Sequence, residues 1–167
     1  MKTKLHGLFL ALLSVVVFTA CDNDDDDLRL SDVPTVVIDS FETQFPNAGR
    51  AEWETKTGYL VVDFWLDGIE THAWYNRDGE WKMTESDLGL NMKALPQTVQ
   101  DAFQSGQYAS WTVDNIDKYE RSTDVFYLIE VETVGQQDRK LFYDPEGILL
   151  RDEPDKDNDD VTPSISF

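Results

Sequence analysis

The chain of 167 residues has few of the side chains on which catalytic and metal sites most often depend. It contains one cysteine, Cys21, and two histidines, His6 and His72. A single cysteine excludes an internal disulfide. Neither histidine is accompanied by a nucleophile elbow or a glycine-rich phosphate loop. A zinc site rich in histidine is also excluded. Carboxylates are numerous enough for acid–base chemistry, but the sequence as a whole predicts no enzyme and requires no cofactor.

Basic residues are also scarce. The chain has 14 Lys and Arg against 33 Asp and Glu, a formal net charge of −19. Lys2 and Lys4 are the only charged residues before position 21, so the remainder carries 12 − 33 = −21. Such a charge repels nucleic acids and anionic lipid head groups. Cations and basic protein surfaces are the partners that it favours.

The longest apolar stretch is too short for a membrane-spanning helix. Leu8 to Ala20 is a run of apolar or small residues, whereas a spanning helix needs about 20 apolar residues. The preceding lysines and the small Thr19 and Ala20 predict a secretory signal over residues 1–20. The alternative is a buried N-terminal helix, which would show a polar face that this run lacks.

Cys21 follows this signal directly, which is the pattern of a bacterial lipoprotein whose cysteine carries lipid. Several acyl chains would anchor it firmly, because each buried CH2 contributes about 0.8 kcal/mol. Phe18 departs from the leucine usual at that position, and the alternative is a free thiol. The aspartates in residues 22–27 predict an extended, solvated tether over 21–32. This run resembles the surface-export signal of Bacteroidetes lipoproteins, which implies an outer-membrane anchor facing outward; the alternative faces the periplasm.

The body of the chain repeats itself. "VPTVVIDSF" at 33–41 matches "LPQTVQDAF" at 95–103, "YLVVDFWLDG" at 59–68 matches "FYLIEVETVG" at 126–135, and "AWYNRDGEW" at 73–81 matches "LFYDPEGIL" at 141–149. The offset grows from 62 to 67 and 68 residues. Small loop insertions produce such a drift, so we predict an internal duplication with copies at about 33–90 and 95–153.

Each copy is predicted to begin with a helix and to continue in hairpins. Val33, Val37, Phe41 and Phe45 recur every fourth residue, which gives one apolar stripe. Ser31 or Asp32 is expected to cap this helix, and the second helix covers about 96–105. Strands are expected at about 51–55, 59–66, 70–75 and 80–84, and again at 110–121, 125–133, 138–143 and 147–150. The predicted fold class is α+β: two tandem repeats of a helix plus antiparallel strands, forming one sheet with the helices on one face.

The motifs "VP..V...F...FP.A....W" and "AWY...GEW" resemble those of the PepSY-like lipoprotein family of Bacteroidetes, over about 33–153. That family is similar in fold to the beta-lactamase inhibitor protein. The resemblance implies protein binding or protease inhibition, and for some members calcium binding. Its motifs are mostly hydrophobic and turn residues, so they specify the fold far better than the function.

Alternation along the strands defines a candidate partner-binding surface. Leu60, Val62, Phe64 and Leu66 are expected under the helices. The opposite face carries the candidate residues Tyr59, Trp65, His72 and Trp74. Large aromatic side chains suit protein recognition, and in the inhibitor-like relatives the open sheet face is where the partner sits. The alternative is that these aromatics pack against a loop, Trp53 or a second molecule.

The C-terminal residues 154–167 are predicted to form an acidic, disordered tail. Asp155, Asp157 and Asp159 have the alternating spacing of a calcium loop, but the glycine and the glutamate of that motif are missing. The leading hypothesis is therefore a non-enzymatic envelope module that binds an unknown protein or peptide through the open sheet face. A calcium-responsive protein and a structural envelope component are the alternatives.

Overall fold

The computed structural model describes residues 26–156 and 161–167. The helices are α1 (Thr35–Gln44) and α2 (Gln97–Ser105), each preceded by a single 3-10 turn, η1 (Leu30–Asp32) and η2 (Met92–Ala94). The strands are β1 (Asp26–Leu28), β2 (Gly49–Lys56), β3 (Tyr59–Leu66), β4 (Ile69–Tyr75), β5 (Trp81–Asp87), β6 (Thr112–Glu120), β7 (Val125–Glu132), β8 (Arg139–Tyr143) and β9 (Leu149–Pro154). A helix followed by four strands thus occurs twice, although the duplication itself stays a prediction.

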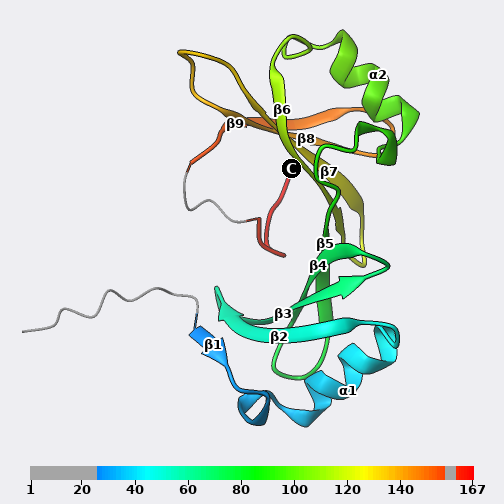
Figure 1. Ribbon diagram of the computed structural model, residues 1–167, viewed down its shortest axis with the longest axis vertical. Helices are drawn as coiled ribbons and strands as arrows, with labels where there is room; N and C mark the ends of the chain where they lie inside the picture. Colours follow the sequence, from blue (N-terminus) through cyan, green and yellow to red (C-terminus); the bar gives the residue numbers. More distant parts are fainter. Residues whose placement is uncertain (1–25, 157–160) are drawn as a thin grey trace, which may run out of the picture.

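The strands form one antiparallel sheet whose spatial order is the order of the chain, β1 to β9 (Figure 1). Short turns connect the strands from β2 to β5 and from β6 to β9, and α1 and α2 lie in the connections from β1 to β2 and from β5 to β6. Gly58 and Gly68 take φ angles of +86° and +85° in two of the turns. Glycine adopts this backbone region without a steric penalty. The α+β class and the antiparallel sheet predicted from the sequence are confirmed.

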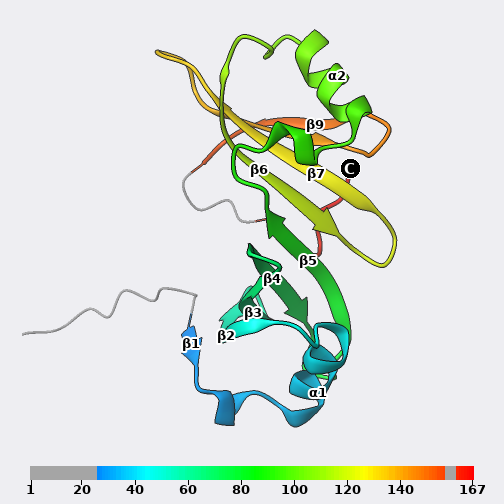
Figure 2. The same ribbon diagram turned by 45° about the vertical axis from the view of Figure 1, so that its right-hand side comes forward.

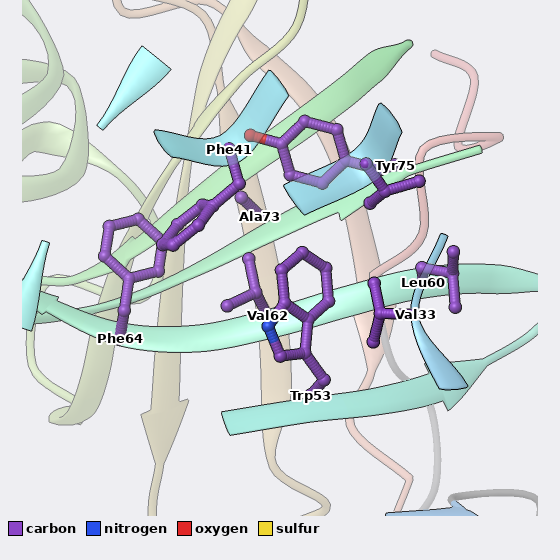
Figure 3. Close-up of a cluster of buried hydrophobic side chains, with 9 residues drawn as sticks. Val33, Phe41, Trp53, Leu60, Val62, Phe64, Ala73 and Tyr75 are labelled. Atoms are coloured by element: carbon purple, nitrogen blue, oxygen red, sulfur yellow. The ribbon is translucent and has the colours of Figure 1, made fainter. Parts of the chain in front are cut away.

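Both helices pack on the same face of the sheet, each over its own half. Val37 and Phe41 of α1 lie over β3, where the Phe41 and Phe64 rings are 5.0 Å apart (Figure 3). Val99 and Phe103 of α2 occupy the equivalent place in the second half. The first cluster also contains Leu60, Val62 and Phe64, which alternation assigned to this face. The second contains Tyr127, Ile129 and Val131 of β7.

A third apolar cluster lies on the opposite face and joins the two halves. Its first-half members are Val61, Trp74 and Met83, and its second-half members are Tyr119, Phe126, Leu128, Phe142 and Val161. Among the described strands, β5 and β6 are the pair that crosses the boundary between the halves (Figure 2), from Thr84–Glu120 to Asp87–Asp117. The third cluster therefore adds side-chain contacts to a short backbone junction.

Two predictions at the N-terminal end of the domain are wrong. Ser31 and Asp32 belong to η1, and Pro34 takes the N-cap position of α1 with no side-chain hydrogen bond. Asp26–Leu28 was expected in the solvated tether but pairs with Trp53–Thr55 of β2 as an edge strand. Strand pairing uses backbone groups, so an acidic sequence does not prevent it.

The C-terminal end also differs from the predicted disordered tail. β9 continues to Pro154, and residues 161–167 lie against the sheet face that carries the third cluster, between the two halves in both views (Figures 1 and 2). Val161 is 8% exposed. The apolar side chains of Val161, Ile165 and Phe167 can be buried against the sheet, which favours an ordered segment. The acidic composition of residues 154–167 as a whole does not reveal these three positions.

Candidate functional site

The candidate site is the sheet face opposite the helices, where charged side chains form a row. The strand register sets Asp63 of β3 beside His72 of β4, and His72 beside Glu85 of β5. His72 Nε2 lies 3.8 Å from Asp63 Oδ1, and its Nδ1 lies 3.8 Å from Glu85 Oε2. Burial alone would lower the pKa of His72, but Glu85, followed by Asp63 and Glu70, outweighs it, and the pKa is raised. The row therefore stabilises positive charge at its centre.

The structure separates the four aromatic and histidine residues predicted to bind a partner. Trp74 is 2% exposed and packs in the third cluster, and Tyr59 is half-buried against the same cluster. His72 is half-buried, with its ring 6.0 Å from that of Trp74. Trp65 is 47% exposed. Of these four residues, Trp65 is the one that offers a large aromatic surface to a partner.

The C-terminal segment, residues 161–167, covers the apolar part of the second half of this face. The Phe167 ring lies 5.0 Å from the Phe126 ring and 5.6 Å from the Phe142 ring. Arg121 donates hydrogen bonds to two backbone carbonyls of the segment, and Arg151 donates to a third. Both guanidinium groups also lie over the Phe167 ring, at 6.0 and 5.4 Å from its centroid. The segment thus covers the second-half aromatics Phe126 and Phe142, and its Val161 shares the third cluster with Trp74.

An acidic cavity of about 250 Å³ lies at the centre of the face. His72, Trp74 and Val161 line it together with Glu54, Lys56, Glu85, Asn115, Asp117, Tyr119, Leu128, Glu130 and Lys140. Lys140 is buried and pairs with Asp155 at 3.1 Å and with Glu130 at 3.8 Å. The cavity therefore combines three basic side chains with four carboxyl groups beside two aromatic walls.

Asp117 is a strongly perturbed carboxyl group of this cavity. It is 5% exposed, and Asn115 Nδ2 donates to its two carboxylate oxygens at 3.1 and 3.2 Å. Burial, reinforced by Glu85, Glu130 and Asp87, raises its pKa to about 8. At neutral pH Asp117 is therefore mainly a neutral carboxylic acid, which can donate a hydrogen bond as well as accept one.

Two hollows flank Trp65 at the first-half end of the face. One, of about 260 Å³, is also lined by Arg50, Glu52, Asp63 and Glu70. The other, of about 340 Å³, is also lined by Gly68, Ile69, Glu70, Asp87, Leu88, Gly89, Asn91 and Ala94. Trp65 therefore stands between two depressions with acidic walls.

Sequence reasoning missed Asp117, Arg121 and Arg151. Alternation along β6 could have found Asp117, because it lies two residues before Tyr119 and shares its face. The arginines act by holding the segment 161–167, and no local pattern links residues so far apart in the chain.

The predicted lipidation site and the predicted calcium loop are only partly described by the structure. Cys21, Asp157 and Asp159 lie outside the described residues. Asp155 is described, and its carboxylate pairs with Lys140. In the described ranges, no helix is long and apolar enough to cross a membrane.

Solved proteins of Bacteroides species share this architecture. A DUF2874 family protein from Bacteroides ovatus is 34% identical, with a TM-score of 0.70, over 74% of this chain and 89% of its own. A BLIP-like protein from Bacteroides fragilis is 29% identical, with a TM-score of 0.71, over 77% and 92%. A Bacteroides eggerthii protein described as "putative periplasmic" is 24% identical, with a TM-score of 0.69, over 73% and 88%. Curated proteins provide no match.

Helices on one face of an antiparallel sheet and a mixed aromatic and charged opposite face define a small α+β protein with an open sheet face. A family model described as "Putative beta-lactamase-inhibitor-like, PepSY-like" matches residues 58–151. The chain belongs to this PepSY-like family.

Proposed function

We propose that this protein is a non-enzymatic binding module of the bacterial cell envelope, and that it engages a protein partner through the first half of its open sheet face. The observation that carries the proposal is Trp65, which is 47% exposed between two hollows on a face that is otherwise largely packed. An exposed tryptophan beside depressions is the usual composition of an interface hot spot. Membership of a beta-lactamase-inhibitor-like family supports a binding role.

The charge around Trp65 specifies the chemistry of the partner. Glu52, Asp63, Glu70 and Asp87 line the two hollows, and Arg50 is paired with Glu52 at 2.8 Å. The whole chain carries a formal charge of −19. A partner that presents basic side chains around an apolar cavity for the indole is complementary to this surface, because opposite potentials favour encounter and docking.

The proposal differs from the patch predicted from the sequence. Trp74 is buried and Tyr59 is half-buried in the third cluster on the same face, so both stabilise the face, whereas Trp65 contacts the partner. A purely structural role was expected to leave the whole face covered by the chain itself. The segment 161–167 covers the second half, but Trp65 and the exposed Ile69 lie beyond it.

The proposed location rests on residues 1–27. The apolar run, Cys21 and the aspartates after it favour a lipid-anchored envelope protein. The description of the Bacteroides eggerthii relative as "putative periplasmic" agrees with this location. Incorporation of labelled fatty acid that is lost in Cys21→Ser tests the anchor, and equal labelling of the two proteins would exclude it.

Site-specific photo-crosslinking in cells tests the binding surface. The full chain carries p-benzoylphenylalanine at position 65, and the matched control carries it at Ile148, an apolar residue that is 60% exposed in the β8–β9 turn. We expect one discrete adduct from position 65 that is absent from position 148. With the purified partner, Trp65→Ala should weaken binding about 30-fold, or 2 kcal/mol, as a hot spot does, while Ile148→Ala leaves it unchanged. No adduct at 65, or equal adducts at both positions, would refute the surface.

A further inference from the structure

We propose that Asp63, Glu70 and His72 form a binding site for one divalent transition-metal ion, with Zn²⁺ as the first candidate. One ligand atom from each of the three side chains lies within 4.8 Å of the other two. All three side chains are half-buried, so an ion can reach them from solvent. The inference does not depend on the proposed partner, because it concerns side chains already gathered by the fold.

The register of two neighbouring strands brings the ligands together. Asp63 of β3 lies directly opposite His72 of β4. Glu70 precedes His72 by two residues on β4, so its side chain points to the same face of the sheet. Paired backbone strands hold all three residues, and strands position a site more firmly than loops do.

The imidazole of His72 is oriented as a metal-bound histidine usually is. Its Nε2 faces the Asp63 carboxylate at 3.8 Å, and its Nδ1 faces Glu85 at 3.8 Å on the other side. A metal-binding histidine commonly places its second ring nitrogen toward a carboxylate, which fixes the tautomer and raises the basicity of the ligand. Glu85 is in the position for that role. This arrangement distinguishes the cluster from an ordinary group of surface acids.

Ligand type and spacing select the ion. Imidazole and carboxylate together suit Zn²⁺, Fe²⁺ or Mn²⁺, whereas Ca²⁺ takes six to eight oxygen ligands. With zinc–ligand bonds of 2.0–2.2 Å, ligand atoms in a tetrahedral site are roughly 3.4 Å apart. The observed 3.8 Å between His72 Nε2 and Asp63 Oδ1 is close to this spacing. A small rotation of the half-buried His72 and Asp63 side chains would bring these two atoms to the tetrahedral spacing.

The surroundings leave room for a further ligand. The hollow of about 260 Å³ beside Trp65 includes Asp63 and Glu70 in its walls. Water or a group from another molecule could occupy the fourth position of a tetrahedral ion there. Three protein ligands with one open position are a common zinc arrangement.

Zinc titration of the full chain in mild detergent tests the site. All proteins carry His6→Ala and Cys21→Ser, so that His72 is the sole histidine and no thiol remains. Competition with a chromophoric zinc chelator measures affinity and stoichiometry, and the visible spectrum of added Co²⁺ reports coordination. We expect one saturable site that is lost in His72→Ala and in Asp63→Asn. Glu85→Gln should bind 10- to 100-fold more weakly, as changes around a metal-bound histidine do.

Glu80→Gln is the matched control, because Glu80 is an exposed carboxylate of the β4–β5 turn that pairs with Lys82. It should bind zinc as the background protein does. Circular dichroism of each variant confirms folding, and Asp63→Asn, which is nearly isosteric, keeps the test valid if His72→Ala does not fold. The proposal is overturned if no saturable site with one ion per chain exists. It is also overturned if folded His72→Ala or Asp63→Asn binds zinc as tightly as the background protein does.

Discussion

At the scale of single residues, the open face is dominated by the cost of burying charge. Asp117, Glu130 and Lys140 lie close together at its centre, and Asp117 and Lys140 are almost fully buried. Lys140 is compensated by Asp155 and Glu130. The carboxylate of Asp117 accepts hydrogen bonds from the neutral amide of Asn115, and protonation relieves the cost of burying it.

Stability should therefore fall as the pH rises. An aspartate in an unfolded chain has a pKa of about 3.9, whereas burial, with Glu85, Glu130 and Asp87, raises the pKa of Asp117 to about 8. Between these values the native state binds a proton that the unfolded state has released, so the free energy of unfolding decreases with pH. Asp117→Asn should remove this part of the slope and be more stable relative to the wild type at pH 9 than at pH 5.

Urea unfolding at a series of pH values measures this effect. Asp78→Asn, at an exposed position in the β4–β5 turn, controls for the loss of one negative charge. If Asp117→Asn and the wild type kept the same pH slope from 4 to 9, Asp117 would be ionised in the native protein.

At the scale of elements, two hairpin turns press against the helices in equivalent ways. Gly79 of the β4–β5 turn has φ +81°, and a Cβ there would lie 2.8 Å from the Val36 carbonyl oxygen of α1. Gly147 of the β8–β9 turn has φ +86°, and its Cβ would lie 2.5 Å from the Thr98 carbonyl oxygen of α2. Each turn thus fixes how its helix sits on the sheet.

Gly79→Ala should lower the free energy of unfolding by about 2–3 kcal/mol, since it combines a left-handed backbone with a steric clash. Gly58→Ala separates the two causes, because Gly58 also has a positive φ, +86°, but nothing lies within 4 Å of its Cβ position. That variant should lose about 1 kcal/mol. Chemical denaturation compares them, and equal losses would mean that the approach of the turn to α1 contributes nothing.

The Phe167 side chain should contribute much of the free energy that holds the C-terminal segment, residues 161–167, on the sheet. Phe167→Ala removes ring contacts with Phe126 and Phe142 and the faces over which Arg121 and Arg151 lie. We expect a loss of about 1–2 kcal/mol, because the side chain is 45% exposed and each cation–π contact adds a fraction of a kcal/mol.

Thermal unfolding together with hydrogen exchange of residues 161–167 measures the loss. Leu90→Ala, at an apolar side chain that is 66% exposed, is the control and should leave both unchanged. Unaltered exchange of the segment in Phe167→Ala would show that the arginine hydrogen bonds and the packing of Val161 hold it without the ring.

At the scale of the whole molecule, the sequence predicted the features that depend on residues close together in the chain, namely the helices, the strands and the face on which each side chain lies. Helical spacing at Val37 and Phe41 and alternation at Leu60, Val62 and Phe64 assigned these residues to the face that they occupy. The candidate site was only partly predictable. Alternation placed Trp65, His72 and Trp74 on one face, but it could not show that Val161 and the second-half aromatics bury Trp74. The pairing of segment 161–167 with Arg121 likewise depends on contacts more than 40 residues apart.

The identity between strand order and chain order has a kinetic consequence. Every neighbouring pair of strands is consecutive in the sequence. The pairings from β2 to β5 and from β6 to β9 close short turns at low entropic cost, whereas α1 lies between β1 and β2 and α2 lies between β5 and β6. Pairings between segments that are close in the sequence form faster than pairings between distant segments. The segment 161–167 makes its contacts with residues distant in the sequence. It can dock only after Arg121, Phe126 and Phe142 have taken their places in the sheet. The chain would thus complete its meander first and close over the sheet as its last step.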